Sequence, residues 1–245
     1  MGASPRISIV IPALQEEKLI GQALEQFPPR LRELLGLEII VSDGGSRDRT
    51  LELARAHADL VVGPSNGERE NISIGRNRGA RAARGEFLMF FNADVLIPDP
   101  ERFIPEMIGA VDGNGTVAAT CNVLIYPGEE NARDRVFHRV SNWYFWLLNK
   151  VGMGMGRGEC HVLTREVFER IGGYQESLAA GEDYELFVRL RRLGSIDFRR
   201  DLKVYESPRR YRKFGYVRII SLWFLNALSV LIFRHAMVKE WKPVR

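Results

Sequence analysis

The chain has 245 residues, of which 45% are hydrophobic and 27% are charged, a composition typical of globular proteins that excludes a fibrous or low-complexity chain. Its two cysteines are too few for a disulfide framework. The net charge of +4 is unevenly distributed. Residues 199–245 carry twelve Lys and Arg against three Asp and Glu, a net charge of +9 that leaves −5 for the first 198 residues. A basic tail on an acidic body indicates an anionic partner for the tail.

Strand-like and helix-like segments alternate along the first 94 residues. Runs of β-branched and apolar residues predict strands, and apolar residues spaced three or four apart predict helices. Ser46 is expected to cap the second helix and Gly85 to end the third. The alternation predicts an α/β fold with a mostly parallel, Rossmann-like sheet covered by helices on both faces. In chain order the expected elements are a strand at 6–14, a helix at 15–27, a strand at 37–46, a helix at 46–58, a strand at 59–64, a helix at 70–85 and a strand at 86–94.

Two acidic residues lie where predicted strands end. Asp43 follows "EIIVS", and Asp94 closes "FLMFFNAD". In open α/β sheets, ligands bind beyond the carboxyl ends of the strands, so both carboxylates are expected to face one crevice. Asp is also common in turns after strands, and taken singly each residue has the alternative of being a plain turn residue.

Four ordered segments resemble the family 2 glycosyltransferases, which have the GT-A fold and use nucleotide-diphospho-sugar donors. The segments are "ISIVIPALQEEKLI", "IIVSDGGSRDRT", "GRNRGARAARGEFLMFFNAD" and "REVFERIGGYQESLAAGEDYELFVRLRRLG". They are similar to the family's opening strand, its VDDGSxDxT segment, its Asn-x-Gly and DxD run, and its acceptor-side segment with a Glu-Asp pair. The resemblance covers residues 6–195, and four segments in this order are far more specific than any one of them.

The resemblance implies a divalent cation, Mg²⁺ or Mn²⁺, that neutralises the leaving diphosphate. Its expected ligand is Asp94, the last residue of the DxD-like triplet, because hard cations prefer carboxylate oxygens. Asp43 would hold the nucleobase or the ribose. The further residues that the resemblance places on the donor side are Pro12, Ala13, Glu16, Gly44, Arg76, Asn77, Asn92 and Ala93.

Inverting transfer also needs a base that takes the proton from the acceptor hydroxyl. The family uses the Asp of its Glu-Asp pair, which here is Asp183, with Glu182 beside it. Without the resemblance, the segment 181–194 predicts only an amphipathic helix with acidic residues at its positively polarised N-terminus.

The chain departs from the family pattern at several positions. Asn92 replaces the first Asp of the DxD triplet and offers only a neutral oxygen, which puts the strength of metal binding in doubt. Gln15 and Gly44 also differ from the usual Asn and Asp. The QxxRW motif of processive synthases is absent, which favours the addition of one sugar.

The segment "GMGMGRGECHVLTREVF" at 152–168 lies before the acceptor-side Glu-Asp pair, and its glycines suggest a mobile loop near the acceptor. Within it, Glu159 and His161 are candidates for substrate contact, although a lone His in such a place is more often structural. Cys160 lacks further ligands at usable spacing for a metal site.

The chain is expected to divide into a GT-A domain at residues 1–205 and a basic C-terminal helical extension at 206–245. Residues 217–233 are short for a membrane span, and their polar positions share one side of a helix, which favours a helix lying in a membrane interface. The alternatives are a helix that packs on the sheet and a dimer contact. A second amphipathic candidate lies at 139–150. The basic residues Arg209, Arg210, Arg212 and Lys213 are candidates for lipid phosphates, the donor diphosphate or an acceptor, the plain alternative being a solvated basic face.

Together these features predict an inverting, metal-dependent transferase that moves one sugar from a UDP- or GDP-linked donor to a hydroxyl acceptor, lipid-linked or another cell-envelope glycan precursor. The start of the chain does not match a signal peptide, because Pro12 interrupts a short apolar run, so we expect a cytoplasmic protein at the inner face of the cell membrane. One alternative is a degenerate domain that binds a nucleotide sugar or a membrane partner without catalysis. A nucleotidyltransferase is disfavoured because the first strand lacks a glycine-rich basic signature after it, and nucleic-acid binding is disfavoured by the apolar helix within the tail.

Overall fold

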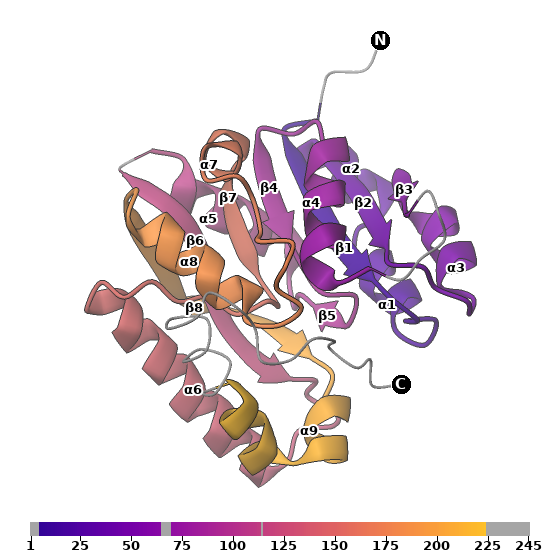
Figure 1. Cartoon of the computed structure of the whole chain (residues 1–245). Coiled ribbons are helices and arrows are strands. Elements are labelled where there is room, and N and C mark those ends of the chain that lie inside the picture. Colours follow the sequence, from indigo (N-terminus) through magenta and orange to yellow (C-terminus); the bar gives the residue numbers. More distant parts are fainter. Residues whose placement is uncertain (1–4, 65–69, 114, 224–245) are drawn as a thin grey trace.

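The structure is a computed structural model that describes residues 5–64, 70–113 and 115–223. These residues form an eight-stranded sheet with helices on both faces (Figure 1). The order across the sheet is β3-β2-β1-β4-β7-β6-β8-β5. In chain order the strands are β1 Ile7–Ala13, β2 Leu37–Asp43, β3 Leu60–Val62, β4 Phe87–Phe90, β5 Val95–Leu96, β6 Thr116–Ile125, β7 His161–Thr164 and β8 Ser195–Glu206.

Helices cover the sheet in two layers. One core cluster joins α1, α2, α3 and α5 to one face, and a second joins α4, α7 and α8 to the other. The long helix α6 packs along β6 and β8 beside the sheet (Figure 1). The helices are α1 Ile20–Glu25, α2 Pro29–Leu35, α3 Thr50–His57, α4 Ile72–Ala82, α5 Pro100–Val111, α6 Ala132–Lys150, α7 Arg165–Arg170, α8 Glu182–Arg191 and α9 Arg209–Phe214.

The N-terminal half of the sheet is parallel and the C-terminal half is mixed. β1 pairs in parallel with β2 and β4, and β2 pairs in parallel with β3, so the carboxyl ends of these strands lie at one edge. β7 runs antiparallel to β4 and β6, β8 runs parallel to β6, and β5 runs antiparallel to β8. The predicted α/β fold is confirmed. The parallel half brings together the segments that follow β1, β2 and β4.

Several predicted element boundaries are wrong. α1 begins at Ile20 instead of residue 15. Pro29 begins α2, with Pro28 before it as the N-cap, because proline suits the first position of a helix. Ser46 does not cap α3, which starts at Thr50 after Arg49. The Ser46 hydroxyl instead accepts a hydrogen bond of 2.8 Å from the backbone N–H of Gln15, which joins the loop after β1 to the loop after β2.

Gly85 lies beyond the end of α4, which closes at Ala83, and it has a packing role. Its N–H donates to the Ser8 hydroxyl at 2.8 Å, and that hydroxyl donates to the buried Glu38 carboxylate at 2.6 Å. A Cβ added to Gly85 would lie 2.7 Å from the Ser8 nitrogen and 2.8 Å from the Ile7 carbonyl carbon. Only glycine therefore allows the chain to approach β1 this closely.

Part of the predicted C-terminal extension packs on the domain. Buried Tyr211 and Ile219 form a cluster with Ile125 of β6, and the rings of Phe137 and Trp223 pack against it. Of the predicted interfacial helix 217–233, residues 217–223 are helical, and the remainder lies outside the described residues. Within the described ranges, no helix has both the length and the apolar content that crossing a bilayer requires. The division at residues 205 and 206 stays a prediction.

We predict that Gly85→Ala destabilises the fold by about 1–3 kcal/mol, because the added methyl group would overlap backbone atoms of β1 that cannot rotate away. Gly109→Ala is the matched control, since Gly109 lies in α5 with nothing within 4 Å of an added Cβ, and alanine favours helix there. Urea unfolding of the two variants measures the difference, and equal midpoints would contradict the prediction.

Candidate active site

A cleft of about 1070 Å³ lies beyond the carboxyl ends of β1, β2 and β4. Its walls come from these strand ends, the turn after β4, the segment before β7, the N-terminal end of α8, and helices α6 and α9. This is the crevice that the sequence predicts for a parallel α/β sheet. The predicted site residues that border it are Pro12, Ala13, Glu16, Gly44, Arg76, Asn92, Ala93, Asp94, Glu159, Glu182, Asp183, Arg209 and Arg210.

Asn77 and Arg212 are two of the predicted site residues that do not border the cleft. The side chain of Asn77 donates to the Tyr174 carbonyl at 2.8 Å and to Glu176 at 3.0 Å, and it accepts from the Tyr174 N–H at 2.9 Å. Asn77 thus holds the segment before α8 against α4. Arg212 forms an ion pair with the buried Asp134 at the start of α6. Both residues are occupied with structural contacts in this structure.

Asp43 lies directly beneath the cleft surface and is only 2% exposed. Its Oδ2 accepts hydrogen bonds from the backbone N–H groups of Gly45 at 2.9 Å and Ser46 at 2.8 Å, as a turn residue does. Its Oδ1 is buried without a hydrogen-bond partner. The neighbours Ser42 and Gly44 border the cleft. Asp43 therefore forms the turn and also has an acceptor oxygen left over beside the cleft.

Glu16 and Asp94 share one cation at the end of the cleft near β1. The Nη2 of Arg209 lies 2.6 Å from Glu16 Oε1 and 3.2 Å from Asp94 Oδ2. Burial raises the pKa of both carboxyl groups, and the charge of Arg209 opposes that rise. The other oxygen of Glu16, Oε2, is buried without a hydrogen-bond partner. This end of the cleft therefore attracts positive charge, which Arg209 supplies here.

The oxygen atoms at this end suit a hard divalent cation. Asp94 offers a carboxylate that borders the cleft, and Glu16 lies across Arg209 from it. Within the described part of the chain, no three His, Cys, Asp or Glu side chains form a cluster that could hold a metal ion by themselves. Mg²⁺ in proteins is commonly held by one or two carboxylates together with substrate phosphates. The residues present therefore fit a cation whose coordination a bound diphosphate completes.

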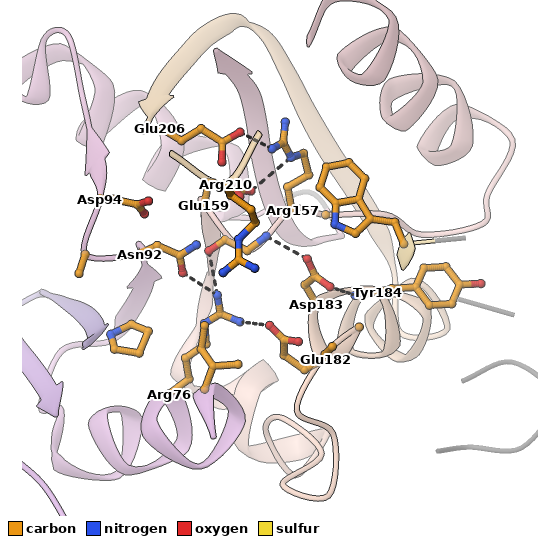
Figure 2. A pocket seen from close by; sticks show the side chains of 18 of the residues that line it. Arg76, Asn92, Asp94, Arg157, Glu159, Glu182, Asp183, Tyr184, Glu206 and Arg210 are labelled. Carbon is orange, nitrogen blue, oxygen red and sulfur yellow. Dashed lines mark hydrogen bonds and ion pairs between the residues drawn. The ribbon is translucent and has the colours of Figure 1, made fainter. Parts of the chain in front are cut away.

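Arg76 lies at the bottom of the cleft, between its two ends (Figure 2). Its guanidinium forms an ion pair of 2.8 Å with Glu182 and donates to the Asn92 side-chain oxygen and the Gly158 carbonyl, both at 2.9 Å. It also lies 5.1 Å from the centre of the Tyr174 ring. The side chain has no exposed area. In this structure Arg76 therefore has no exposed surface with which to contact a donor directly, as the sequence predicted it would.

Asp183 is the second residue of α8 and lies at the other end of the cleft. Its Oδ2 accepts a hydrogen bond of 3.0 Å from the Gly158 N–H, and its Oδ1 accepts one of 2.8 Å from the Tyr184 N–H. Burial raises the pKa of Asp183 to about 7, the charge of Glu182 adds to the rise, and Arg76 opposes it. A carboxyl group with this pKa is divided between its two protonation states near neutral pH, which suits a general base.

A buried ion network that the sequence did not predict lies beside Asp94 (Figure 2). Arg157, only 4% exposed, lies 2.6 Å from Glu206 Oε1 and 3.2 Å from Glu159 Oε2. The Tyr211 hydroxyl donates to Glu206 at 2.8 Å. Burial, with a contribution from Glu159, raises the pKa of Glu206 to about 8. This network anchors α9, and thus Arg209 and Arg210, to the cleft. Its only sequence signal is one Arg between two glycines, "GRG".

The glycine-rich segment 152–158 packs closely on α8, where the sequence suggested a mobile loop. A Cβ on Gly154 would lie 2.5 Å from the Phe187 carbonyl oxygen, and one on Gly156 would overlap the Phe187 ring. A Cβ on Gly158 would lie 2.8 Å from Arg76 Nη2 and 3.7 Å from Asp183 Oδ2. These glycines therefore allow the segment to lie directly against the helix that carries Asp183.

One wall of the cleft is apolar, and its residues were not predicted from the sequence to belong to the site. It is formed by α6 and by the helical residues 216–223. Val140, Tyr144 and Ile220 border the cleft and are 59%, 49% and 47% exposed, and Phe137 and Trp223 lie beside them. The period of apolar residues in 139–150 predicted the amphipathic helix but not which of its faces meets a cleft.

Solved structures of glycosyltransferases share this fold. Glucosyl-3-phosphoglycerate synthase from Mycobacterium tuberculosis, in complex with Mn²⁺, UDP and glucosyl-3-phosphoglycerate, aligns with a TM-score of 0.61 at 22% identity over 94% of this chain and 80% of that chain. Mannosyltransferase PcManGT from Pyrobaculum calidifontis, in complex with GDP-Man and Mn²⁺, aligns with a TM-score of 0.61 at 21% identity over 84% of this chain and 57% of that chain. At these identities the likeness establishes the GT-A fold.

A family description, Glycosyl transferase family 2, matches residues 8–172, which is more than half of the chain. The chain belongs to glycosyl transferase family 2. The resemblance inferred from the four sequence segments is thereby confirmed.

Two curated relatives show the range of similarity. Glucosyl-3-phosphoglycerate synthase of Mycolicibacterium smegmatis is 34% identical over 116 residues, which are 44% of this chain and 36% of that protein. The succinoglycan biosynthesis protein ExoA of Rhizobium meliloti is 28% identical over 193 residues, which are 76% of this chain and 58% of that protein. The chain therefore spans less than two thirds of the length of these relatives.

Proposed function

We propose that this protein transfers one sugar from a nucleotide-diphospho-sugar to a hydroxyl acceptor, with inversion at the anomeric carbon and with the help of a divalent cation. The observation that supports this most directly is that Asp94 and Asp183 border the same cleft, one beside cationic side chains and the other with a pKa suited to a base (Figure 2). Family membership and the GT-A fold agree with this assignment.

The donor would lie along the strand ends. Pro12, Ala13 and Gly44 border the surface there, and the spare oxygen of Asp43 would accept a hydrogen bond from the base or the ribose. Mn²⁺ or Mg²⁺, when held by Asp94 and the diphosphate, supplies positive charge that stabilises the leaving group. Arg209 and Arg210 border the same region and would stabilise the diphosphate as its charge develops. Related structures contain either UDP or GDP-Man, and we propose a donor of one of these two types.

Asp183 would act on the acceptor. Its carboxylate takes the proton of the acceptor hydroxyl while the hydroxyl oxygen bonds to the anomeric carbon and the bond from that carbon to the diphosphate breaks. The nucleoside diphosphate leaves on the side opposite the attacking oxygen, so the configuration inverts. Asn92, Arg76 and Glu182 line the cleft together with Asp94 and Asp183, and the sugar would lie between the two aspartates.

The acceptor class follows from the apolar wall. Val140, Tyr144 and Ile220 border the cleft and are exposed. Removing such apolar surface from water is favourable. An acceptor with an apolar portion next to its hydroxyl would cover them. We therefore propose a lipid-linked acceptor, used by a cytoplasmic protein at the inner face of the cell membrane. Basic residues on α6 and after it, among them Arg139, Lys150 and Lys213, would favour an anionic lipid surface.

The first test is Asp183→Asn. We predict that it lowers turnover by at least about 100-fold, because a carboxamide cannot accept the proton, while the affinity for UDP or GDP is retained. In the wild type the rate should rise with pH through about 7, since burial keeps Asp183 protonated below that value. Sugar transfer and calorimetric nucleotide binding are measured across pH 5–9. Normal turnover by the variant would refute the base assignment, and a wild type that binds but never transfers would support the non-catalytic alternative.

The second test is Asp94→Asn. We predict that Mn²⁺ tightens nucleotide binding in the wild type and that the variant loses this gain by at least about tenfold, because a neutral amide is a poor ligand for a hard cation. Binding without Mn²⁺ should survive, since Arg209 and Arg210 remain. Calorimetric titration of UDP and GDP with and without Mn²⁺ gives both affinities. An unchanged effect of Mn²⁺ would remove Asp94 from the metal site.

The third test is Val140→Asp, which places a charge on the apolar wall. We predict a rise of at least about tenfold in KM for an alkyl-chain acceptor, with donor hydrolysis unaffected, because the loss of even small apolar contacts costs this much. Val136→Asp is the matched control, since Val136 is on the same helix and 64% exposed but does not border the cleft. If both variants behave alike, the acceptor does not lie on this wall.

A further inference from the structure

Arg76 connects parts of the chain that are far apart in sequence. It projects from α4 and bonds to Asn92, Gly158 and Glu182, which are 16, 82 and 106 residues away. These partners belong to the turn after β4, the segment before β7 and the start of α8. One guanidinium thus holds three separate segments at hydrogen-bond distance, 2.8–2.9 Å from each (Figure 2).

Each partner of Arg76 is directly linked to a residue with a proposed role. Asn92 opens the turn that ends at Asp94. Glu182 immediately precedes Asp183, and the Gly158 N–H donates to Asp183 Oδ2 at 3.0 Å. Two partners of Arg76 are therefore linked to Asp183, Glu182 as its chain neighbour and Gly158 by a hydrogen bond. The third partner, Asn92, is two residues from Asp94.

We propose that Arg76 is a positioning residue that sets the distance between the diphosphate end of the cleft at Asp94 and the base Asp183. This inference rests on the proposed function. A transfer reaction is sensitive to that distance, because the attacking oxygen, the anomeric carbon and the leaving oxygen must lie in line, and a misplacement of 1 Å can cost about 100-fold in rate.

The chemistry of arginine explains why this residue type stands here. Its planar guanidinium directs several N–H groups in fixed directions, whereas a lysine ammonium is a compact charge that cannot span three partners in the same plane. Arg76 Nη1 serves Glu182, and Nη2 serves both Asn92 and Gly158. Its charge also lowers the pKa of Asp183, against the larger effect of burial.

The surroundings of Arg76 leave it little freedom to move. The side chain has no exposed area, and the Tyr174 ring lies 5.1 Å from the guanidinium carbon. A methyl group at Gly158 would lie only 2.8 Å from Arg76 Nη2. The distance between the two ends of the cleft is thus fixed by close packing as well as by hydrogen bonds.

The test is Arg76→Lys, which keeps the positive charge and removes the planar fork. We predict that kcat falls by about 100-fold at every pH, while the affinity for UDP or GDP and the midpoint of the pH–rate profile stay at wild-type values. The matched control is Arg189→Lys. Arg189 pairs with Glu185 on α8 and donates to two backbone carbonyls, of Ile171 and Gly173, but it does not border the cleft. That variant should keep its kcat even if its melting temperature falls.

Gly158→Ala provides a second variant in case Arg76→Lys does not fold. It changes no charge, and its added methyl group should separate Arg76 from the Gly158 carbonyl, so we predict the same fall in kcat with nucleotide affinity retained. Wild-type kcat in either folded variant would overturn the proposal. So would a loss of nucleotide affinity at constant kcat, which would indicate a donor contact, or a displaced pH midpoint with an unchanged plateau, which would indicate only an effect on the pKa. A wild-type chain that transfers no sugar from any UDP- or GDP-linked donor would instead overturn the proposed function, and this role with it.

Discussion

A guanidinium that is excluded from water must be neutralised where it lies, because an unpaired buried charge costs several kcal/mol. Arg76 is in this position, and Glu182 is its ionic partner. The helix that carries Arg76 packs on the parallel half of the sheet, and the helix that carries Glu182 packs nearer the mixed half. The β4–β7 ladder joins the two halves within the sheet, and this ion pair links them a second time through the helices that pack on them. Asp94 and Asp183 border the cleft that lies between these halves.

The positive charge of the C-terminal region is distributed among separate partners. Arg209 neutralises Glu16 and Asp94, and Arg212 neutralises Asp134. Arg210 extends into the cleft (Figure 2). The anionic partner that the net charge suggested is thus supplied partly by the acidic body of the same chain. Because Arg209 is already bound to the carboxylates that would meet a donor complex, its charge is available at the cleft before any ligand arrives.

The fold and the general location of the site could be predicted from sequence, because strand and helix periods are local and because parallel strands bring their carboxyl ends together. The contacts that build the site depend on tertiary structure and could not. Nothing in the pattern of α4 distinguishes buried Arg76 from the arginines on its exposed side, since arginine is ordinarily a surface residue. Ser46 looked like a helix cap because its true partner, the N–H of Gln15, lies 31 residues away. The pairing of Arg157 with Glu206 spans 49 residues, and a sequence offers no means of choosing that glutamate.

The position of β8 in the sheet has a consequence for biosynthesis. β8 lies between β6 and β5, and β5 has no other partner strand in the described sheet, so residues 95–96 cannot join the sheet until residues 205–206 have left the ribosome. A chain interrupted before that point keeps β6 with an unpaired edge, which is a template for aggregation. It also lacks the helix that brings arginine to Asp94. During synthesis there is therefore an interval in which the strands of the parallel half are complete while β8 and α9, on the opposite side of the cleft, have not yet been made.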